Sequence, residues 1–119
     1  MQQFRFLEWE AYKDSQELFT FIHNLVKKLP REYRFELGSQ ILRSTSSVIL
    51  NLAEGSGKES EKELNRFIET SLGSLYETLA NLDILRINKL IDVKEFDFGK
   101  TKIASICSQL GGFKKKLKL

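Results

Sequence analysis

The chain has 119 residues, of which 41% are apolar and 29% are charged, and its formal net charge is +3. This length favours one domain, residues 1–119, and the balanced composition excludes a wholly disordered chain. No apolar run reaches the ~18 residues that a membrane span needs, and the N-terminus lacks the pattern of a signal peptide. We therefore expect a cytoplasmic protein with no membrane partner. A single cysteine, Cys107, agrees with a reducing compartment.

Basic residues are distributed unevenly along the chain. Residues 100–119 hold six lysines and no acid, so the other ninety-nine residues hold 13 basic and 16 acidic ones. A protein coated uniformly with positive charge for nucleic-acid binding would look different. The distribution predicts a mildly acidic body with a basic end.

The first two predicted helices span about residues 8–29 and 33–54, on either side of Pro30. Each carries an apolar stripe at helical spacing. The first stripe is Ala11, Ser15, Leu18, Phe19, Ile22, Leu25, Val26 and Leu29, and the second is Gly38, Ile41, Leu42, Thr45, Val48, Ile49 and Leu52. Gly55-Ser56-Gly57 then predicts a C-cap in the left-handed conformation that glycine adopts readily.

The third and fourth predicted helices span about residues 61–88 and 93–117, and each begins with capping-box spacing. Ser60 precedes Glu63 at the third, and Asp92 precedes Glu95 at the fourth. Gly111-Gly112 should fray the last turns of the fourth helix, since glycine costs up to ~1 kcal/mol relative to alanine there. Four amphipathic helices joined by short connections predict an all-α fold, an antiparallel up-down-up-down four-helix bundle.

The second and third helices also carry side chains that their buried stripes do not require. Small residues among them allow another helix to approach closely, and exposed isoleucines favour a contact between subunits. The alternative is a scatter of exposed apolar residues, which is normal on any protein. The candidate interface residues are Arg43, Ser46, Leu50, Gly73, Tyr76, Ala80, Ile84 and Ile87.

Motifs for catalysis or cofactor binding are weak. Gly55-Ser-Gly57-Lys58 resembles part of a phosphate-binding loop, but Leu52 stands where that loop needs glycine and Glu59 where it needs Ser or Thr. His23 is the only histidine, so a Cys/His zinc site is excluded, and no nucleophile has a paired base. We expect no catalytic residue, no metal and no cofactor, and hence no enzyme.

Two basic clusters are candidates for binding RNA or DNA through phosphates. In an up-down bundle they lie at opposite ends, and a ring of subunits would display two basic rims. The C-terminal cluster could instead bind an anionic membrane surface or form a solvated helix end. The clusters are Lys27, Lys28, Arg31 and Arg34 near the first turn, and Lys114, Lys115, Lys116 and Lys118 at the C-terminus.

A resemblance to a known family lies mainly in the second and third helices. The stretch Gln40-Ile-Leu-Arg-Ser-Thr-Ser-Ser-Val-Ile-Leu-Asn-Leu-Ala-Glu-Gly-Ser-Gly57 resembles the signature of the four-helix-bundle family of 23S rRNA intervening-sequence proteins. Its most specific residues are Asn51, Ala53, Glu54, Gly55 and Gly57. The chain departs from the pattern at Leu50, where the family commonly has proline, and at the Gly111-Gly112 pair.

The resemblance implies properties that spacing and composition do not show. Members are encoded within intervening sequences of large-subunit ribosomal RNA genes in some bacteria, or stand alone, and most have no established activity. A related branch, the accessory proteins of diversity-generating retroelements, binds nucleic acid, partners a reverse transcriptase and forms homopentameric rings. The resemblance favours a non-enzymatic, oligomeric, nucleic-acid-associated adaptor. The alternative is a protein–protein interaction module, such as an accessory subunit of a reverse transcriptase.

The physical role of the signature follows from its position at the end of the second helix. The last carbonyl groups of a helix have no intrahelical partner and need other donors, or water, to satisfy them. We expect Asn51 and Glu54 to satisfy backbone groups there, and the two glycines to allow the tight reversal of the chain.

Overall fold

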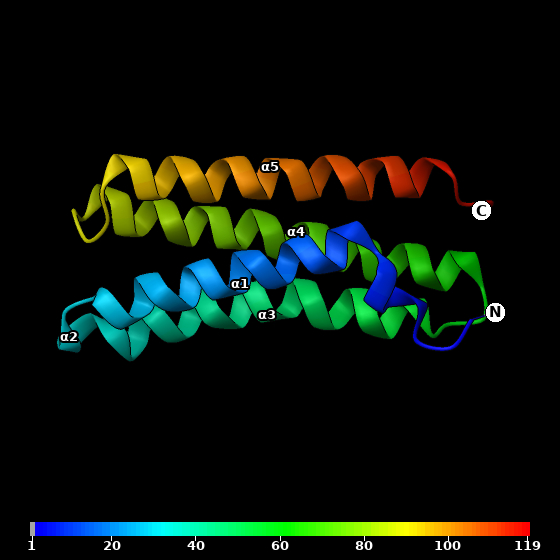
Figure 1. Cartoon of the computed structure of the whole chain (residues 1–119), viewed down its shortest axis with the longest axis horizontal. Helices are drawn as coiled ribbons and strands as arrows, with labels where there is room; N and C mark the ends of the chain where they lie inside the picture. The colour runs from blue at the N-terminus through cyan, green and yellow to red at the C-terminus, as the bar shows by residue number, and fades with distance from the viewer. Residues whose placement is uncertain (1) are drawn as a thin grey trace.

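Four long helices alternate in direction along the chain in the computed structural model, which describes residues 2–119 and leaves Met1 outside the description. They are α1 (Glu10–Lys28), α3 (Glu36–Ser56), α4 (Glu61–Ile87) and α5 (Val93–Lys115). Figure 1 shows α1 and α4 running toward the end of the bundle that carries α2, while α3 and α5 run back toward the end where both termini lie. The predicted all-α, up-down-up-down four-helix bundle is confirmed.

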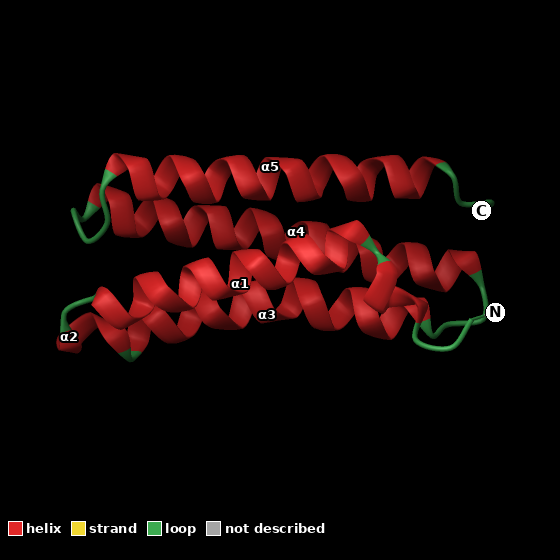
Figure 2. Ribbon diagram, viewed as in Figure 1, coloured by secondary structure: helices red, strands yellow, loops and turns green. Residues whose placement is uncertain are grey.

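Two short helices, η1 (Arg5–Glu8) and α2 (Arg31–Arg34), correct the predicted boundaries. The chain is extended at Trp9, so the first long helix starts at Glu10 and not near residue 8. It is extended again at Leu29 and Pro30, and Phe35 then separates α2 from the start of α3 at Glu36. The loops between the long helices are short (Figure 2).

The caps follow the predicted spacing. The Ser60 hydroxyl accepts the backbone N–H of Glu63 at 3.1 Å, which satisfies one free donor at the start of α4. At α5 the box is complete, because Asp92 accepts the Glu95 N–H at 2.7 Å and Glu95 accepts the Asp92 N–H at 3.0 Å. The Gly111-Gly112 pair does not break α5, which continues to Lys115.

The predicted stripes face inward and form one core. Each long helix contributes fully buried side chains, including Leu18, Ile22, Ile41, Leu52, Ile68, Leu75, Leu82, Ile106 and Leu110. α1 packs against α3 and α5, α4 packs against the same two helices, and the contact between α3 and α4 is the most extensive. No helix among residues 2–119 combines the length and apolarity that crossing a membrane requires.

Candidate functional site

Gly55 lies at a point where α3 packs closely against α4. It is buried, and a Cβ built there would lie 2.7 Å from the Cβ of Phe67 and 3.2 Å from Cδ1 of Leu64. Such a contact is far shorter than the usual 3.5–4.0 Å between carbon atoms. Glycine is therefore needed at this position because it lets the two helices touch.

The predicted left-handed cap at Gly55–Gly57 is wrong. None of the glycines among residues 2–119 has a positive φ, and Gly57 has φ −89° and ψ −1°. Gly55 is an internal residue of α3, and the helix continues through Ser56. The reversal begins only after Gly57, whose N–H donates to the Glu54 carbonyl at 3.2 Å.

Asn51 does not cap the end of α3, which corrects the role expected for it. Its side-chain amide donates to the Ser47 carbonyl one turn earlier, at 2.8 Å, and to the Ser47 hydroxyl at 3.1 Å. Glu54 is exposed, and Ala53 is half-buried. The end of α3 is instead satisfied by Arg5, whose Nε donates to the Ser56 carbonyl at 3.2 Å. A contact across fifty-one positions gives no local sequence signal.

A line of small hydroxyl residues joins α3 to α4, and the sequence stripes missed most of it. The Ser44 and Thr78 hydroxyls lie 2.9 Å apart in the core. Ser71 donates to the Val48 carbonyl, and Ser74 donates to the Ser47 hydroxyl, both at 2.9 Å. Because these side chains are short and satisfied, the helix backbones can pack closely without leaving buried polar groups unpaired. We call Ser44, Ser47, Ser71, Ser74 and Thr78 the hydroxyl seam.

The first basic cluster lies at the α2 end of the bundle, and its members differ in how free they are. Lys28 pairs with Glu95 of α5 at 2.7 Å, and this hydrogen bond raises the pKa of its ammonium group. Arg34 donates through Nε and Nη2 to the Leu29 carbonyl, which satisfies the end of α1. Lys27 and Arg31 are exposed, and within residues 2–119 neither has a carboxylate within ion-pair distance.

The second basic cluster lies at the opposite end, as predicted, where α5 finishes (Figure 1). Lys114 pairs with Glu69 of α4 at 3.2 Å, so its charge is already compensated. The backbone N–H of Lys118 donates to the Glu61 carboxylate at 2.9 Å, which holds the C-terminal residues against the start of α4. The side chains of Lys115, Lys116 and Lys118 remain exposed. Each end of the bundle therefore keeps some, though not all, of its predicted cations free.

The candidate interface residues project away from the core, on the outer sides of α3 and α4. Arg43, Gly73 and Ala80 are exposed, and Ser46 is half-buried. The large apolar members are Leu50, Tyr76, Ile84 and Ile87, which are 64%, 72%, 42% and 63% exposed. Sequence reasoning missed other exposed aromatics, above all Phe35 between α2 and α3, which is 83% exposed. The sequence feature that could have identified Phe35 is its position close to Tyr33, Arg31 and Arg34.

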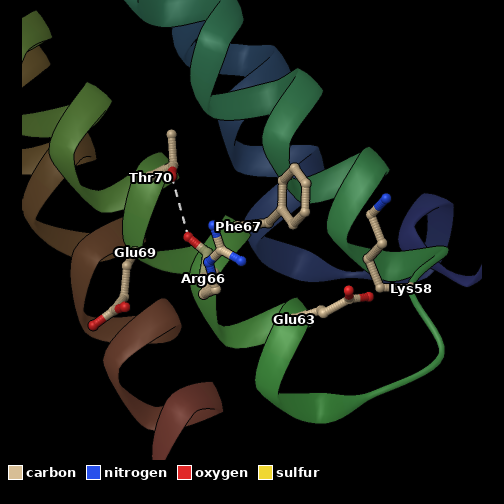
Figure 3. Close-up of a pocket in the computed structure, with 6 residues that line it drawn as sticks. All are labelled: Lys58, Glu63, Arg66, Phe67, Glu69 and Thr70. Carbon is tan, nitrogen blue, oxygen red and sulfur yellow. Dashed lines mark hydrogen bonds between the residues drawn. The ribbon is translucent and has the colours of Figure 1, made fainter.

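A surface cavity of about 560 Å³ lies beside the first turns of α4, next to the signature. Its lining side chains spread along the helix and do not converge on one point (Figure 3). Lys58 lies over the Phe67 ring at 5.2 Å, and Glu69 is held by Lys114. Two cations, Lys58 and Arg66, alternate with two carboxylates, so the lining favours neither an anion nor a cation.

A groove of about 640 Å³ lies where α5 ends beside η1 and the start of α4. Trp9 and Phe113 meet edge to face there, with ring centroids 4.8 Å apart. Arg5 and Lys116 on its rim are balanced by Glu10 and Glu61. Like the first cavity, it holds no arrangement typical of a catalytic centre.

The groups singled out for reactivity are dispersed. Cys107 is half-buried on α5, and burial raises the pKa of its thiol, which makes it a poorer nucleophile. His23 is exposed on α1 and stacks on Phe19. Within residues 2–119, no three His, Cys, Asp or Glu side chains come together as metal ligands would.

Comparison with protein families decides the relationship that the signature suggested. The model of the 23S rRNA-intervening sequence protein family matches residues 8–112. The chain belongs to this family. In this family member the match includes the signature and the first basic cluster. It ends before Lys114, so the C-terminal lysines lie outside the part that matches the family model.

A solved structure shares the fold of this family member. It is the crystal structure of a protein of unknown function from the S23 ribosomal protein family of Bacteroides thetaiotaomicron. The two chains superpose with a TM-score of 0.82 at 24% identity, over 89% of this chain and 99% of the other. Comparison with curated proteins finds no match.

Proposed function

We propose that the protein is a non-enzymatic, homo-oligomeric adaptor whose subunits pack through the outer sides of α3 and α4 and which binds RNA or DNA at its basic ends. The supporting observation is the set of apolar side chains on these outer sides, of which Leu50, Tyr76 and Ile87 are more than half exposed. Burying one such side chain stabilises a contact by about 1.5–3 kcal/mol. An interface between copies would remove this surface from water.

The two outer sides differ in a way that favours a head-to-tail contact. The outer side of α3 offers Arg43 and Leu50, whereas that of α4 offers Gly73, Ala80 and Ile84. A Cβ built at Gly73 meets no atom within 4 Å, so the backbone of α4 is open to a neighbour there. Contacts between unlike surfaces close into rings when the rotation allows it. The resemblance to ring-forming proteins favours five copies.

The oligomer is tested by measuring mass with light scattering during gel filtration. The wild-type chain should elute at a multiple of its 13.8 kDa, and I84E should shift it to the monomer because a carboxylate cannot be buried there unpaired. V93E is the matched control, since Val93 is 63% exposed on α5, outside the proposed contact. A monomeric wild-type chain at every concentration rules out this assembly.

Nucleic-acid binding is supported by the free cations at both ends. It predicts a binding constant that falls as the salt concentration rises. Each phosphate neutralised on a duplex should contribute about 0.9 to the slope of log K against log salt. Removing two free cations by the double substitution of Lys115 and Lys116 to Gln should lower that slope by up to about 2. Binding that does not depend on salt, or no binding at all, contradicts the proposal.

The second candidate is a protein–protein interaction module, such as an accessory subunit of a reverse transcriptase. It is favoured by the internal pairing of Lys28 and Lys114, which reduces the positive charge left for phosphates. In that case a partner protein should remain bound to the purified chain after complete nuclease digestion. Loss of every partner on digestion would favour the nucleic-acid adaptor.

A further inference from the structure

The α2 end of the bundle presents an exposed aromatic side chain among cations. Phe35 is 83% exposed and is the most exposed of the large apolar side chains described. Tyr33, two residues earlier, is 40% exposed. An exposed phenyl ring at the tip of a bundle adds nothing to the core, and it is available to a ligand with a flat apolar face.

The backbone beneath this ring is held firmly. Leu29, just before α2, is buried, and its carbonyl accepts two N–H groups of Arg34 at 3.2 and 3.0 Å. The Tyr33 N–H donates to the Pro30 carbonyl at 2.9 Å. Further along, Gly38 packs so closely on α1 that a Cβ there would lie 2.7 Å from Cγ1 of Val26. The ring therefore projects from a fixed platform and not from a loose loop.

The segment that carries the ring has a net positive charge. Residues 27–36 carry four cations and two carboxylates, Glu32 and Glu36. Lys28 is paired with Glu95, while Lys27 and Arg31 have no ion-pair partner within residues 2–119. Arg34 uses Nε and Nη2 on the backbone, which leaves Nη1 available to an anion. An exposed aromatic side chain in a segment with free cations is the combination that binds an unpaired base and its phosphates.

The C-terminal cluster differs in this respect. Its neighbouring aromatic residue, Phe113, is half-buried and packs edge to face on Trp9. Lys115, Lys116 and Lys118 can attract phosphates, but the exposed ring at this end of the bundle is Phe4, which is 63% exposed and stands before η1, outside the lysine cluster. The two ends should thus recognise nucleic acid differently.

We propose that the α2 end, with Phe35 as stacking platform and Lys27, Arg31 and Arg34 as phosphate contacts, is a binding site for unpaired nucleotides of single-stranded nucleic acid. This inference rests on the proposed nucleic-acid function and adds the form of the ligand and the residue that selects it. A duplex keeps its bases stacked on one another, so it can use the cations but not the ring. Single strands therefore gain an interaction that duplexes lack.

The test measures the affinity of wild type, F35A, F35L and F35W for two labelled RNAs by fluorescence anisotropy. One RNA is a 12-nucleotide oligouridine and the other is a 12-base-pair duplex. F35A and F35L should weaken single-strand binding about 5- to 100-fold, as loss of one stacked base does. Duplex binding and the salt slope should stay unchanged. F35W should keep the affinity, and the oligouridine should quench the added indole emission. F98A is the control, since Phe98 is also exposed but stands on α5 against Phe21.

The contrary outcomes separate the two proposals. If wild type binds both RNAs and F35A binds them equally well, the stacking site is overturned while nucleic-acid binding stands. If wild type binds neither RNA, both proposals fail. If F35L keeps its affinity while F35A loses it, the site recognises an apolar partner or membrane and not a base. A change in the mass of the assembly on F35A would place Phe35 in a protein contact and also overturn the site.

Discussion

Replacing Gly55 by alanine tests how closely α3 and α4 must approach. The new methyl group would lie 2.7 Å from the Cβ of Phe67, an atom fixed to the backbone of α4 that no side-chain rotation can move. The helices would have to separate, and overpacking of this kind costs about 1–3 kcal/mol. Alanine recovers up to about 1 kcal/mol through its better helix propensity. We expect a net loss of about 1–2 kcal/mol in the free energy of unfolding.

Gly111→Ala is the matched control, because Gly111 also lies inside a helix but a Cβ there meets no atom within 4 Å. Only the propensity gain applies, so G111A should stabilise the protein by about 0.5–1 kcal/mol. Urea unfolding followed by circular dichroism at 222 nm measures the free energy of unfolding of both variants. All samples are kept at one protein concentration, because assembly adds to the apparent stability. A G55A variant as stable as wild type or G111A would refute the close approach of the helices.

Two further predictions concern buried and interhelical polar contacts. Thr78→Val removes the hydroxyl that faces Ser44 in the hydroxyl seam and should lower the free energy of unfolding by about 1–2 kcal/mol. Thr101 is exposed, so the control T101V should change the free energy of unfolding by less than about 0.5 kcal/mol. The hydrogen bond to Glu17 raises the pKa of Lys102, so this pair stabilises fully below the ordinary lysine value of about 10.4 and is lost as pH rises through the raised pKa. Wild type should therefore lose more stability than K102M above about pH 10, and parallel alkaline unfolding curves would contradict this.

The helices and their buried faces could be predicted because helical periodicity is a local property of the sequence. Ile41 and Leu52 fall on a stripe whether or not the partner helix is known, and both are fully buried. Ser44 and Thr78 lie outside the predicted stripes, because polar residues are expected on the surface of a helix. They are buried because their hydroxyls meet between α3 and α4. The sequence pattern thus defines the faces of the helices better than the contacts between them.

The physical role predicted for the signature was wrong. A glycine near the end of a helical pattern usually indicates a cap, and Gly55 fits that pattern. Its actual requirement is set by Phe67 on the next helix, which no local rule considers. In the same way, the cations of the two basic clusters could be found by composition. Which of them are free depends on partners such as Glu95 and Glu69, far away in the chain.

Assembly through α3 and α4 with nucleic acid at the ends is tested most directly by sedimentation velocity of a labelled RNA mixed with the protein. The RNA should sediment with a species whose mass is several times 13.8 kDa, and with I84E it should sediment with the monomer or remain free. The proposal would be contradicted by wild-type protein that sediments as a 13.8 kDa monomer and leaves the RNA boundary unchanged.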